Sequence, residues 1–479
     1  MDNTKTTLIA NTSYIVGFTG TQHFLLKKGE LAYKGNEVIY VGKSFPGQAD
    51  EIIDAQGGFV IPGLINLHCH IAASPVEKGF LEDTGNPNLY MTGLYEYLRV
   101  THITPEDQMK VFNFSLSDIL TKGSTTIFEL GLGTEEMVEA IGNSGIRAYI
   151  GLMARSGVFM SKDGRKVHYE WDEPEAFRRL AVTLQRREKY DDSFSGRIKI
   201  ALYPGQVDTC TPDFLREIGK VASQTKMCVA THAAQTVNEY QIILEKYGRT
   251  PADFLTENGI AGPRVMYGHY ILPSGHSMNA LKIGNELKTI ADAGTSIVHC
   301  PWGHGRRGII MESFNKYLDL GINLCLGTDT FPQDMINEMR CAAVFCKIAE
   351  ANPNRGTAAQ IFNAATLGGA KALGRDDIGR LSPGAKADIV IIDTNNLETC
   401  PLRDPIKVLI YTASSRNISK VIVDGNIIVE NGIVKNMDEQ LLIKDMQAVA
   451  ERMWENVKNK DWGGRSHLEM SPMSFPVVE

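Results

Sequence analysis

The middle of the chain consists of short apolar runs separated by amphipathic stretches. Four of these runs end in a histidine or an aspartate: FVIPGLINLHCH, KMCVATH, RVMYGH and INLCLGTD. Because none of them alternates in polarity, they are typical of strands buried on both faces of a parallel sheet. The stretches between them predict helices, several of which begin at a Thr-Pro pair (Thr104-Pro105, Thr211-Pro212 and Thr250-Pro251). Repeated strand and helix units over residues 61–379 predict a (β/α)8 barrel, that is, a TIM barrel.

The two ends of the chain have a different pattern, with short strand candidates divided by turn residues. Hairpin turns are expected at Gly35-Asn36, Asp424-Gly425 and Asn431-Gly432. Residues 1–60 and 380–435 therefore predict a small β-sandwich domain built from both termini.

The last part of the chain, residues 436–479, predicts a helix followed by a tail without periodicity. The helix has apolar residues at helical spacing (Leu442, Met446, Val449, Met453 and Val457). We expect it to pack on the barrel or on a partner subunit. The tail could wrap around its own chain, exchange with a neighbour or be disordered.

Composition and charge exclude several classes of partner. The chain has 479 residues, 43% of them hydrophobic, and a formal net charge of -7. This charge gives no basic field for nucleic acid, and no apolar run reaches the roughly 18 residues of a membrane span. The first residues lack the features of a secretory signal, and most of the eight cysteines lie inside apolar runs, as reduced core cysteines do. We expect a cytoplasmic protein that binds neither nucleic acid nor membrane.

The candidate chemistry lies at the ends of the apolar runs. Residues i and i+2 of a strand point to the same face, so His68 and His70 can meet one ion. Such a pair alone is as often structural as functional. However, barrel active sites lie at the carboxyl ends of the strands, where His232, His269 and Asp329 are also expected. Agreement of all four runs favours a metal site.

Several motifs together resemble the amidohydrolase superfamily: IPGLINLHCH, THAAQ, YGH, GTDT, AATLGGAKALGR and GRLSPGAKADIVIID. Within it the chain resembles the branch of guanine and adenosine-analogue deaminases and triazine hydrolases, over almost its whole length. The resemblance implies one divalent ion held by His68, His70, His232 and Asp329. It also implies that His269 lies beside the attacking water or the substrate.

Three imidazoles and one carboxylate suit Zn²⁺, and Fe²⁺, Mn²⁺ or Co²⁺ are also compatible with them. We expect Asp329 to act as both ligand and general base. For His269, contact with water or substrate is favoured over direct ligation. No lysine stands at a clear strand end to bridge two ions, so one metal is favoured over two.

Two departures from the related deaminases concern proton transfer. The deaminases carry a glutamate three residues after the fifth-strand histidine, where this chain has Gln235, and an amide cannot exchange protons as a carboxyl does. The loop after the fourth strand, residues 203–206, lacks the branch's histidine. Glu239, one helical turn after Gln235, could partly substitute, although an exposed helix residue is favoured.

We therefore expect hydrolysis of an amide, urea, carbamate or amino-heterocycle C–N bond in a small molecule. Two alternatives stay open: deamination of a purine, pterin or triazine-like ring, and hydrolytic displacement of a substituent such as chloride. A remote alternative is a noncatalytic assembly protein that keeps the fold, which has no use for four converging ligands. Barrels of this branch commonly pair, so a homodimer or higher homo-oligomer is expected.

Specificity is expected from the loops after the first and seventh strands. The first holds aromatic residues that could line a lid or only pack the loop down (Phe80, Tyr90, Tyr95 and Tyr97). The seventh supplies candidate substrate contacts that could equally be solvated (His299, Trp302, His304 and Arg306, with Arg307 beside them). Gln235 is a further candidate substrate contact.

Overall fold

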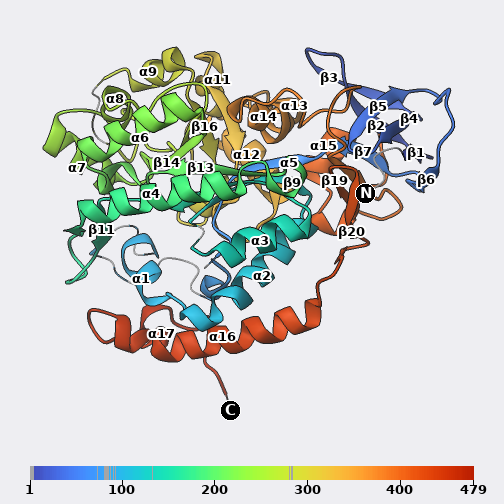
Figure 1. Cartoon of the computed structure of the whole chain (residues 1–479). Helices are drawn as coiled ribbons and strands as arrows, with labels where there is room; N and C mark the ends of the chain where they lie inside the picture. The colour runs from blue at the N-terminus through green and yellow to red at the C-terminus, as the bar shows by residue number, and fades with distance from the viewer. Residues whose placement is uncertain are drawn as a thin grey trace.

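The computed structural model describes residues 5–72, 74–79, 86, 88, 89, 91, 93–131, 133–279, 281 and 284–478. Figure 1 shows a barrel surrounded by helices, a β-rich domain at one side that combines the beginning and the end of the chain, and a long C-terminal helix beneath the barrel. Among the described residues, no helix combines the length and the apolar character needed to cross a bilayer.

Eight parallel strands form the central sheet. In chain order they are β8 (Leu64–Cys69), β9 (Ser124–Leu130), β10 (Arg147–Met153), β13 (Ile198–Tyr203), β14 (Val229–Ala233), β15 (Val265–His269), β16 (Ser296–His299) and β17 (Asn323–Leu326). Nearly every residue in them is buried, as the uninterrupted apolar runs predicted. The prediction of a (β/α)8 barrel is therefore confirmed.

The first and last strands close the barrel at their carboxyl ends. The backbone N–H of Asp329 donates to the carbonyl of His68 at 2.8 Å, and the N–H of His70 donates to the carbonyl of Asp329 at 2.8 Å. This seam brings together two segments that the sequence separates by about half the chain.

Helices cover the outside of the barrel. They include α2 (Pro105–Thr121), α3 (Glu135–Ser144), α4 (Glu173–Tyr190), α6 (Pro212–Thr225), α7 (Val237–Tyr247), α8 (Pro251–Glu257), α9 (Glu286–Ala293), α11 (Phe314–Asp319), α12 (Met335–Ala349) and α13 (Ala358–Asn363). Three of them begin at the expected Thr-Pro pairs. The hydroxyls of Thr211 and Thr250 accept backbone N–H groups of α6 and α8, whereas the side chain of Thr104 makes no capping hydrogen bond.

The β-rich domain contains two sheets. One has four strands, β1 (Thr6–Ala10), β4 (Glu30–Lys34), β5 (Glu37–Gly42) and β6 (Glu51–Asp54); the other has seven, β2 (Tyr14–Phe18), β3 (His23–Lys27), β7 (Phe59–Pro62), β18 (Ile389–Ile392), β19 (Ile418–Val423), β20 (Asn426–Glu430) and β21 (Ile433–Val434). Because β7 pairs with β18, both ends of the chain share one sheet. The sandwich prediction is confirmed, while its exact domain boundaries stay a prediction.

Buried ion pairs join this domain to the barrel. The Arg147 guanidinium on β10 donates to Asp388 at 3.0 Å and to Asp424 at 3.1 Å, with all three side chains almost inaccessible to solvent. Removing one partner of such a group leaves a buried charge and typically costs about 3–5 kcal/mol. The two parts of the molecule are therefore firmly connected.

The C-terminal segment wraps along its own chain. Helix α16 (Glu439–Lys460) packs against α2 and α1 (Leu98–Val100), and the short α17 (His467–Met470) follows. Met446, Val449, Met453 and Val457 are buried as their spacing predicted, while Leu442 is half-buried. In Figure 1 both C-terminal helices lie below α1 and α2.

Candidate functional site

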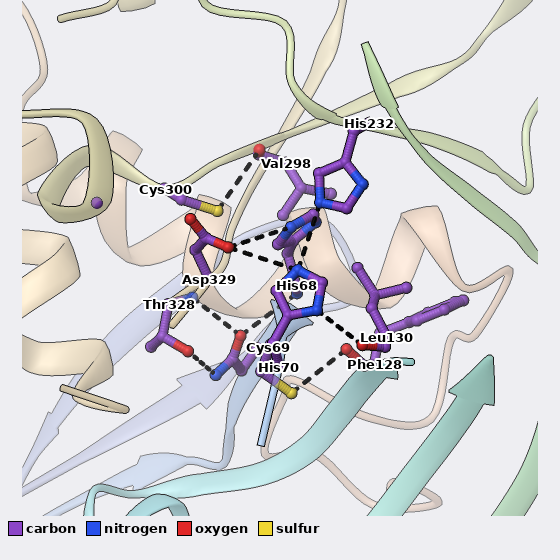
Figure 2. Close-up of polar contacts among 12 residues, drawn as sticks. His68, Cys69, His70, Phe128, Leu130, His232, Val298, Cys300, Thr328 and Asp329 are labelled. Carbon is purple, nitrogen blue, oxygen red and sulfur yellow. Dashed lines mark hydrogen bonds and ion pairs between the residues drawn. The ribbon is translucent and has the colours of Figure 1, made fainter. Parts of the chain in front are cut away.

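The ends of the barrel strands β8, β14 and β17 bring three histidines and an aspartate together (Figure 2). The Nε2 atoms of His70 and His232 lie 3.3 Å apart. Asp329 Oδ1 lies 3.5 Å from Nε2 of His70 and 3.7 Å from Nε2 of His68. The structure thus brings together the four residues that the sequence predicted as metal ligands.

Backbone carbonyls orient two of these imidazoles. Nδ1 of His70 donates to the Leu130 carbonyl at 2.7 Å, and Nδ1 of His232 donates to the Gly205 carbonyl at 2.9 Å. A neutral imidazole that carries its proton on Nδ1 has a lone pair on Nε2. The two Nε2 lone pairs therefore face each other across 3.3 Å, which a cation between them would stabilise.

His68 completes the set. Its side chain is 1% exposed, and its Nε2 atom has no hydrogen-bond partner among the described residues. A buried polar nitrogen without a partner is costly unless something binds it. Three nitrogen donors and one carboxylate oxygen are a donor set that divalent transition metals bind, so the residues present match the group that the sequence predicted.

Burial keeps the imidazoles of His68 and His232 neutral. It lowers the pKa of His68 well below its ordinary value and lowers the pKa of His232 to about 4, with neighbouring histidines adding to the effect. Metal ligation requires the neutral imidazole. His68 and His232 can therefore bind a cation at neutral pH without first losing a proton.

The backbone is strained at three of the strand ends. Asp329 has φ 58°, His269 has φ 70° and Ala234, two residues after His232, has φ 49°. Residues other than glycine rarely adopt this left-handed conformation, which costs on the order of 1–3 kcal/mol where the surroundings impose it. Strain concentrated at these positions is typical of a functional site.

His269 lies between the ligand cluster and the loop after β16. Its ring is 4.6 Å from that of His68 and 4.5 Å from that of His304, between centroids. Its Nδ1 has no partner among the described residues. Cys300, His68 and His269 also form a second possible metal-binding trio, but it shares His68 with the first trio (His68, His70 and His232). The two trios therefore overlap at His68.

The candidate contacts from the loop after β16 separate into two groups. His304, in α10 (Pro301–Gly305), is 2% exposed and packs against His269. The ring of His299 instead neighbours Phe314 at 6.1 Å, and the Arg306 guanidinium lies over Phe331 at 4.8 Å. Trp302 is half-buried, and its backbone N–H donates to Glu338. Only His304 is brought against the cluster, and the substrate roles of all four stay predictions.

Gln235 and Glu239 form a connected unit after β14. Gln235 is 4% exposed, and its Nε2 has no partner among the described residues. Glu239 is fully buried rather than on the exposed helix face that we expected, because its carboxyl accepts the backbone N–H groups of Ala234 at 2.5 Å and Gln235 at 3.2 Å. The sequence offered a signal: Thr236 followed three residues later by Glu239 matches a capping box. Glu239 therefore fixes the backbone that carries Gln235.

Tyr203 and Gly205 contact His232 from the end of β13 and the loop that follows it. The Tyr203 hydroxyl lies 3.3 Å from Nδ1 of His232, and the Gly205 carbonyl accepts from the same nitrogen. The Gly205 carbonyl thus orients the His232 ring, and burial raises the pKa of Tyr203, so its hydroxyl keeps its proton near neutral pH.

Part of the first loop is described. Tyr95 and Tyr97 are buried, and the Tyr95 hydroxyl lies 2.7 Å from Thr236 Oγ1, directly beside Gln235. Phe80 and Tyr90 lie outside the described residues. Tyr95 therefore lies beside the loop that carries Gln235, and an aromatic lid stays a prediction.

The comparisons with known proteins agree with this architecture. The model of the family described as "Amidohydrolase family" matches residues 59–428. A 5-methylthioadenosine/S-adenosylhomocysteine deaminase of Acetivibrio thermocellus is 30% identical over 411 residues, which cover 85% of this chain and 89% of the relative.

Solved structures share the fold over nearly the whole chain. An adenosine deaminase from Xanthomonas campestris with bound zinc superposes with a TM-score of 0.80 at 22% identity, covering 95% of this chain and 99% of that one. A triazine hydrolase from Arthobacter aurescens gives a TM-score of 0.80 at 24% identity, covering 93% and 99%. The family match spans more than half of the chain, and the strand-end cluster lies inside it. The chain therefore belongs to the amidohydrolase family.

Proposed function

We propose that this protein is a hydrolase that uses one divalent metal ion, Zn²⁺ in the first place, to cleave a non-peptide C–N bond of a small molecule. The observation that carries the proposal is the convergence of the His68 and His70 Nε2 atoms on Asp329 Oδ1, with the Nε2 lone pairs of His70 and His232 only 3.3 Å apart. Fe²⁺, Mn²⁺ and Co²⁺ suit the same donors.

His68, His70, His232 and Asp329 would hold the ion. When bound, it supplies Lewis-acid chemistry: it polarises a substrate carbonyl or ring carbon and makes water acidic enough to act as a nucleophile near neutral pH. The chain's own residues fix the geometry, since the Leu130 and Gly205 carbonyls set the orientation of two ligand rings.

Asp329 would also accept the proton of the attacking water. Its Oδ1 faces the histidines, and its other oxygen, Oδ2, is directed to the loop after β16, where a Cβ on Gly303 would lie only 3.1 Å away. One oxygen can thus ligate while the other receives a proton and later delivers it to the leaving nitrogen. His269 would orient the water or the substrate carbonyl by a hydrogen bond from its ring.

The amide of Gln235 decides which leaving groups are favoured. Its buried Nε2–H₂ can donate to a carbonyl or ring nitrogen, but it cannot shuttle a proton to departing ammonia. Cleavage of an amide, urea or carbamate bond, or displacement of a substituent on an electron-poor ring, needs less proton transfer from this position. The second candidate is deamination of a purine-like ring, which the identity to the 5-methylthioadenosine/S-adenosylhomocysteine deaminase favours.

Metal content tests the site first. Inductively coupled plasma mass spectrometry on protein purified without added metal should give about one transition-metal ion per chain, and the H68A and D329A variants should lose both metal and activity. A matched control is H276A, which removes an equally buried histidine whose Nε2 donates to the Ile310 carbonyl away from the cluster. About two ions per chain would contradict the mononuclear site, and none after reconstitution would favour the noncatalytic alternative.

A substrate panel tests the reaction class. We expect turnover of amides, ureas or carbamates, with Q235A weakening activity less than loss of a metal ligand does. Ammonia release from purine, pterin or triazine rings would instead support the deaminase, and Q235E should then raise its rate. If wild type released ammonia rapidly and Q235E changed nothing, the inference drawn from Gln235 would be wrong.

Assembly and cellular location stay proposals from the sequence. We propose a homodimer or higher homo-oligomer in the cytoplasm, supported by strongly exposed apolar side chains near the C-terminus such as Phe475 and Val478. Light scattering coupled to size-exclusion chromatography measures the oligomeric state, and a monomer at micromolar concentration would contradict it.

A further inference from the structure

A short segment of the first loop contacts the loop that carries Gln235. We call residues 93–102 the roof segment; it contains the π-helical turn Gly93–Tyr97 and α1. Its Tyr95 is 1% exposed, contacts the Thr236 hydroxyl at 2.7 Å and packs edge-on against Phe159 of β11 (Gly157–Met160) at 5.3 Å between ring centroids. π-Helical turns occur frequently at functional sites.

The residue next to Tyr95 binds a different part of the chain. Glu96 accepts a hydrogen bond from Trp462 Nε1 at 2.6 Å and one from Arg465 Nη2 at 3.0 Å. The Glu96 side chain is 1% exposed and that of Arg465 is 21% exposed. A buried carboxylate needs a charged partner, and Arg465 supplies it.

The contacts continue along both segments. We call residues 461–471 the C-terminal strap. Within it, the Asp461 carboxylate accepts a hydrogen bond from the Arg465 guanidinium at 2.7 Å. The Met470 carbonyl accepts one from the Tyr97 hydroxyl at 2.6 Å. Met470 is fully buried in an apolar cluster with Tyr97. The nonperiodic end of the chain is therefore bound specifically to the roof segment.

Consecutive roof residues thus connect two distant regions. Tyr95 joins a residue 141 positions further along the chain, beside the site, and Glu96 joins one 366 positions along, in the strap. In Figure 1, α1 lies between the barrel above and α16 with α17 below. The strap and the loop that carries Gln235 are therefore connected through two adjacent roof residues.

We propose that the C-terminal strap is a positioning element of the active site: Arg465 and Trp462, acting through Glu96, hold the roof segment against the loop that carries Thr236 and Gln235. The proposal rests on the proposed function only in placing the substrate beneath Tyr95. The strap touches neither the metal ligands nor the reacting atoms, so Arg465, Trp462 and Glu96 are positioning residues.

Hydrogen exchange measured by mass spectrometry tests the strap without any substrate. In R465A, peptides from residues 93–102 should exchange about tenfold faster or more, because local opening becomes easier, while barrel-strand peptides and metal content stay as in wild type. R452A is the matched control. Arg452 also lies in the C-terminal region, but its guanidinium donates to the two carboxylate oxygens of Asp107 in α2, at 2.7 and 2.8 Å, and not to the roof segment. Its roof peptides should exchange as in wild type.

Kinetics then test the consequence for the reaction. With a substrate in hand, R465A should raise KM about tenfold while kcat changes less, and R465K should recover part of the loss, because it restores the charge without the planar fork. If R465A fails to fold, W462F can replace it, because it removes only the indole donor. W462F should raise KM by a smaller factor.

Unchanged exchange of residues 93–102 in both R465A and W462F would overturn the proposal. The proposal would also fail if these residues exchanged as fast in R452A as in R465A. If R465A showed faster exchange of residues 93–102 but the wild type hydrolysed no C–N bond, the positioning role of the strap would be supported and the proposed function would be refuted. The two can therefore fail separately.

Discussion

Replacing Glu239 by glutamine should disturb the site without touching a metal ligand. Both carboxyl oxygens of Glu239 accept backbone N–H groups, from Ala234 at 2.5 Å and from Gln235 at 3.2 Å. Glutamine has the same shape but one acceptor oxygen, so its NH₂ would face one of these N–H groups. A buried N–H left without a partner costs about 1–3 kcal/mol.

The charge of Glu239 contributes in the opposite direction. Burial, and then the negative charge of Asp208, raise the pKa of Glu239 well above its ordinary value, so the ionised form is costly and a neutral glutamine relieves that cost. The lost acceptor still dominates the geometry, because Ala234 is held at φ 49° and can relax once its N–H is released. Relaxation there displaces Gln235.

We therefore expect E239Q to lower kcat about 5- to 150-fold, which corresponds to 1–3 kcal/mol in the transition state, with metal content unchanged. The assay is steady-state hydrolysis together with metal analysis and a thermal melt. E286Q is the matched control, since Glu286 is also buried and accepts the Tyr240 hydroxyl at 2.6 Å and the Ser274 N–H at 2.7 Å away from the site. Full activity of E239Q, or an equal loss in E286Q, would refute the reasoning.

Two further predictions concern pH and packing. Burial lowers the pKa of His299 from 6.5 to about 3, so below pH 6.5 the unfolded chain binds a proton that the folded chain does not, and the stability contributed by the neutral ring is lost as pH falls. Between about pH 7 and pH 5 the unfolding free energy of the metal-free wild type should drop about 2 kcal/mol more than that of H299Q, measured by urea unfolding; equal slopes would contradict this. A Cβ on Gly268 would lie 2.6 Å from Cε1 of His68, so G268A should weaken metal affinity about 10- to 100-fold in a chelator competition, whereas G133A, which meets nothing within 4 Å, should not.

The barrel, the sandwich and the family could be predicted because their signals are local. A strand buried on both faces needs a continuous apolar run, and a tight hairpin needs residues that tolerate positive φ, as Asp424 and Asn431 do at φ 52° and 50°. Strand-end histidines could be placed together because parallel strands of a barrel share one carboxyl end.

The burial of Glu239 and the path of the tail depend on contacts that no local pattern encodes. Glu239 is buried because the residues around it, including Asp208 after β13, close over that face of α7. Residues 461–471 have no periodicity, and their course is set by single polar contacts such as that of Arg465 with Glu96. Likewise, which ring nitrogen of His70 and His232 faces the site follows from the Leu130 and Gly205 carbonyls, which any residue could have supplied.

Closure of the barrel and assembly of the candidate site are the same structural event. The seam between β17 and β8 consists of backbone hydrogen bonds made by His68, His70 and Asp329 themselves, each at 2.8 Å. Close approach at this seam requires Gly327, since a Cβ there would lie 2.6 Å from the Cβ of His68. Asp329 is held in a left-handed conformation at the point where the seam ends. A cation bound by the same three side chains would therefore offset the cost of the left-handed conformation of Asp329 and would disfavour opening of the barrel. Metal binding is in this way coupled to the stability of the fold.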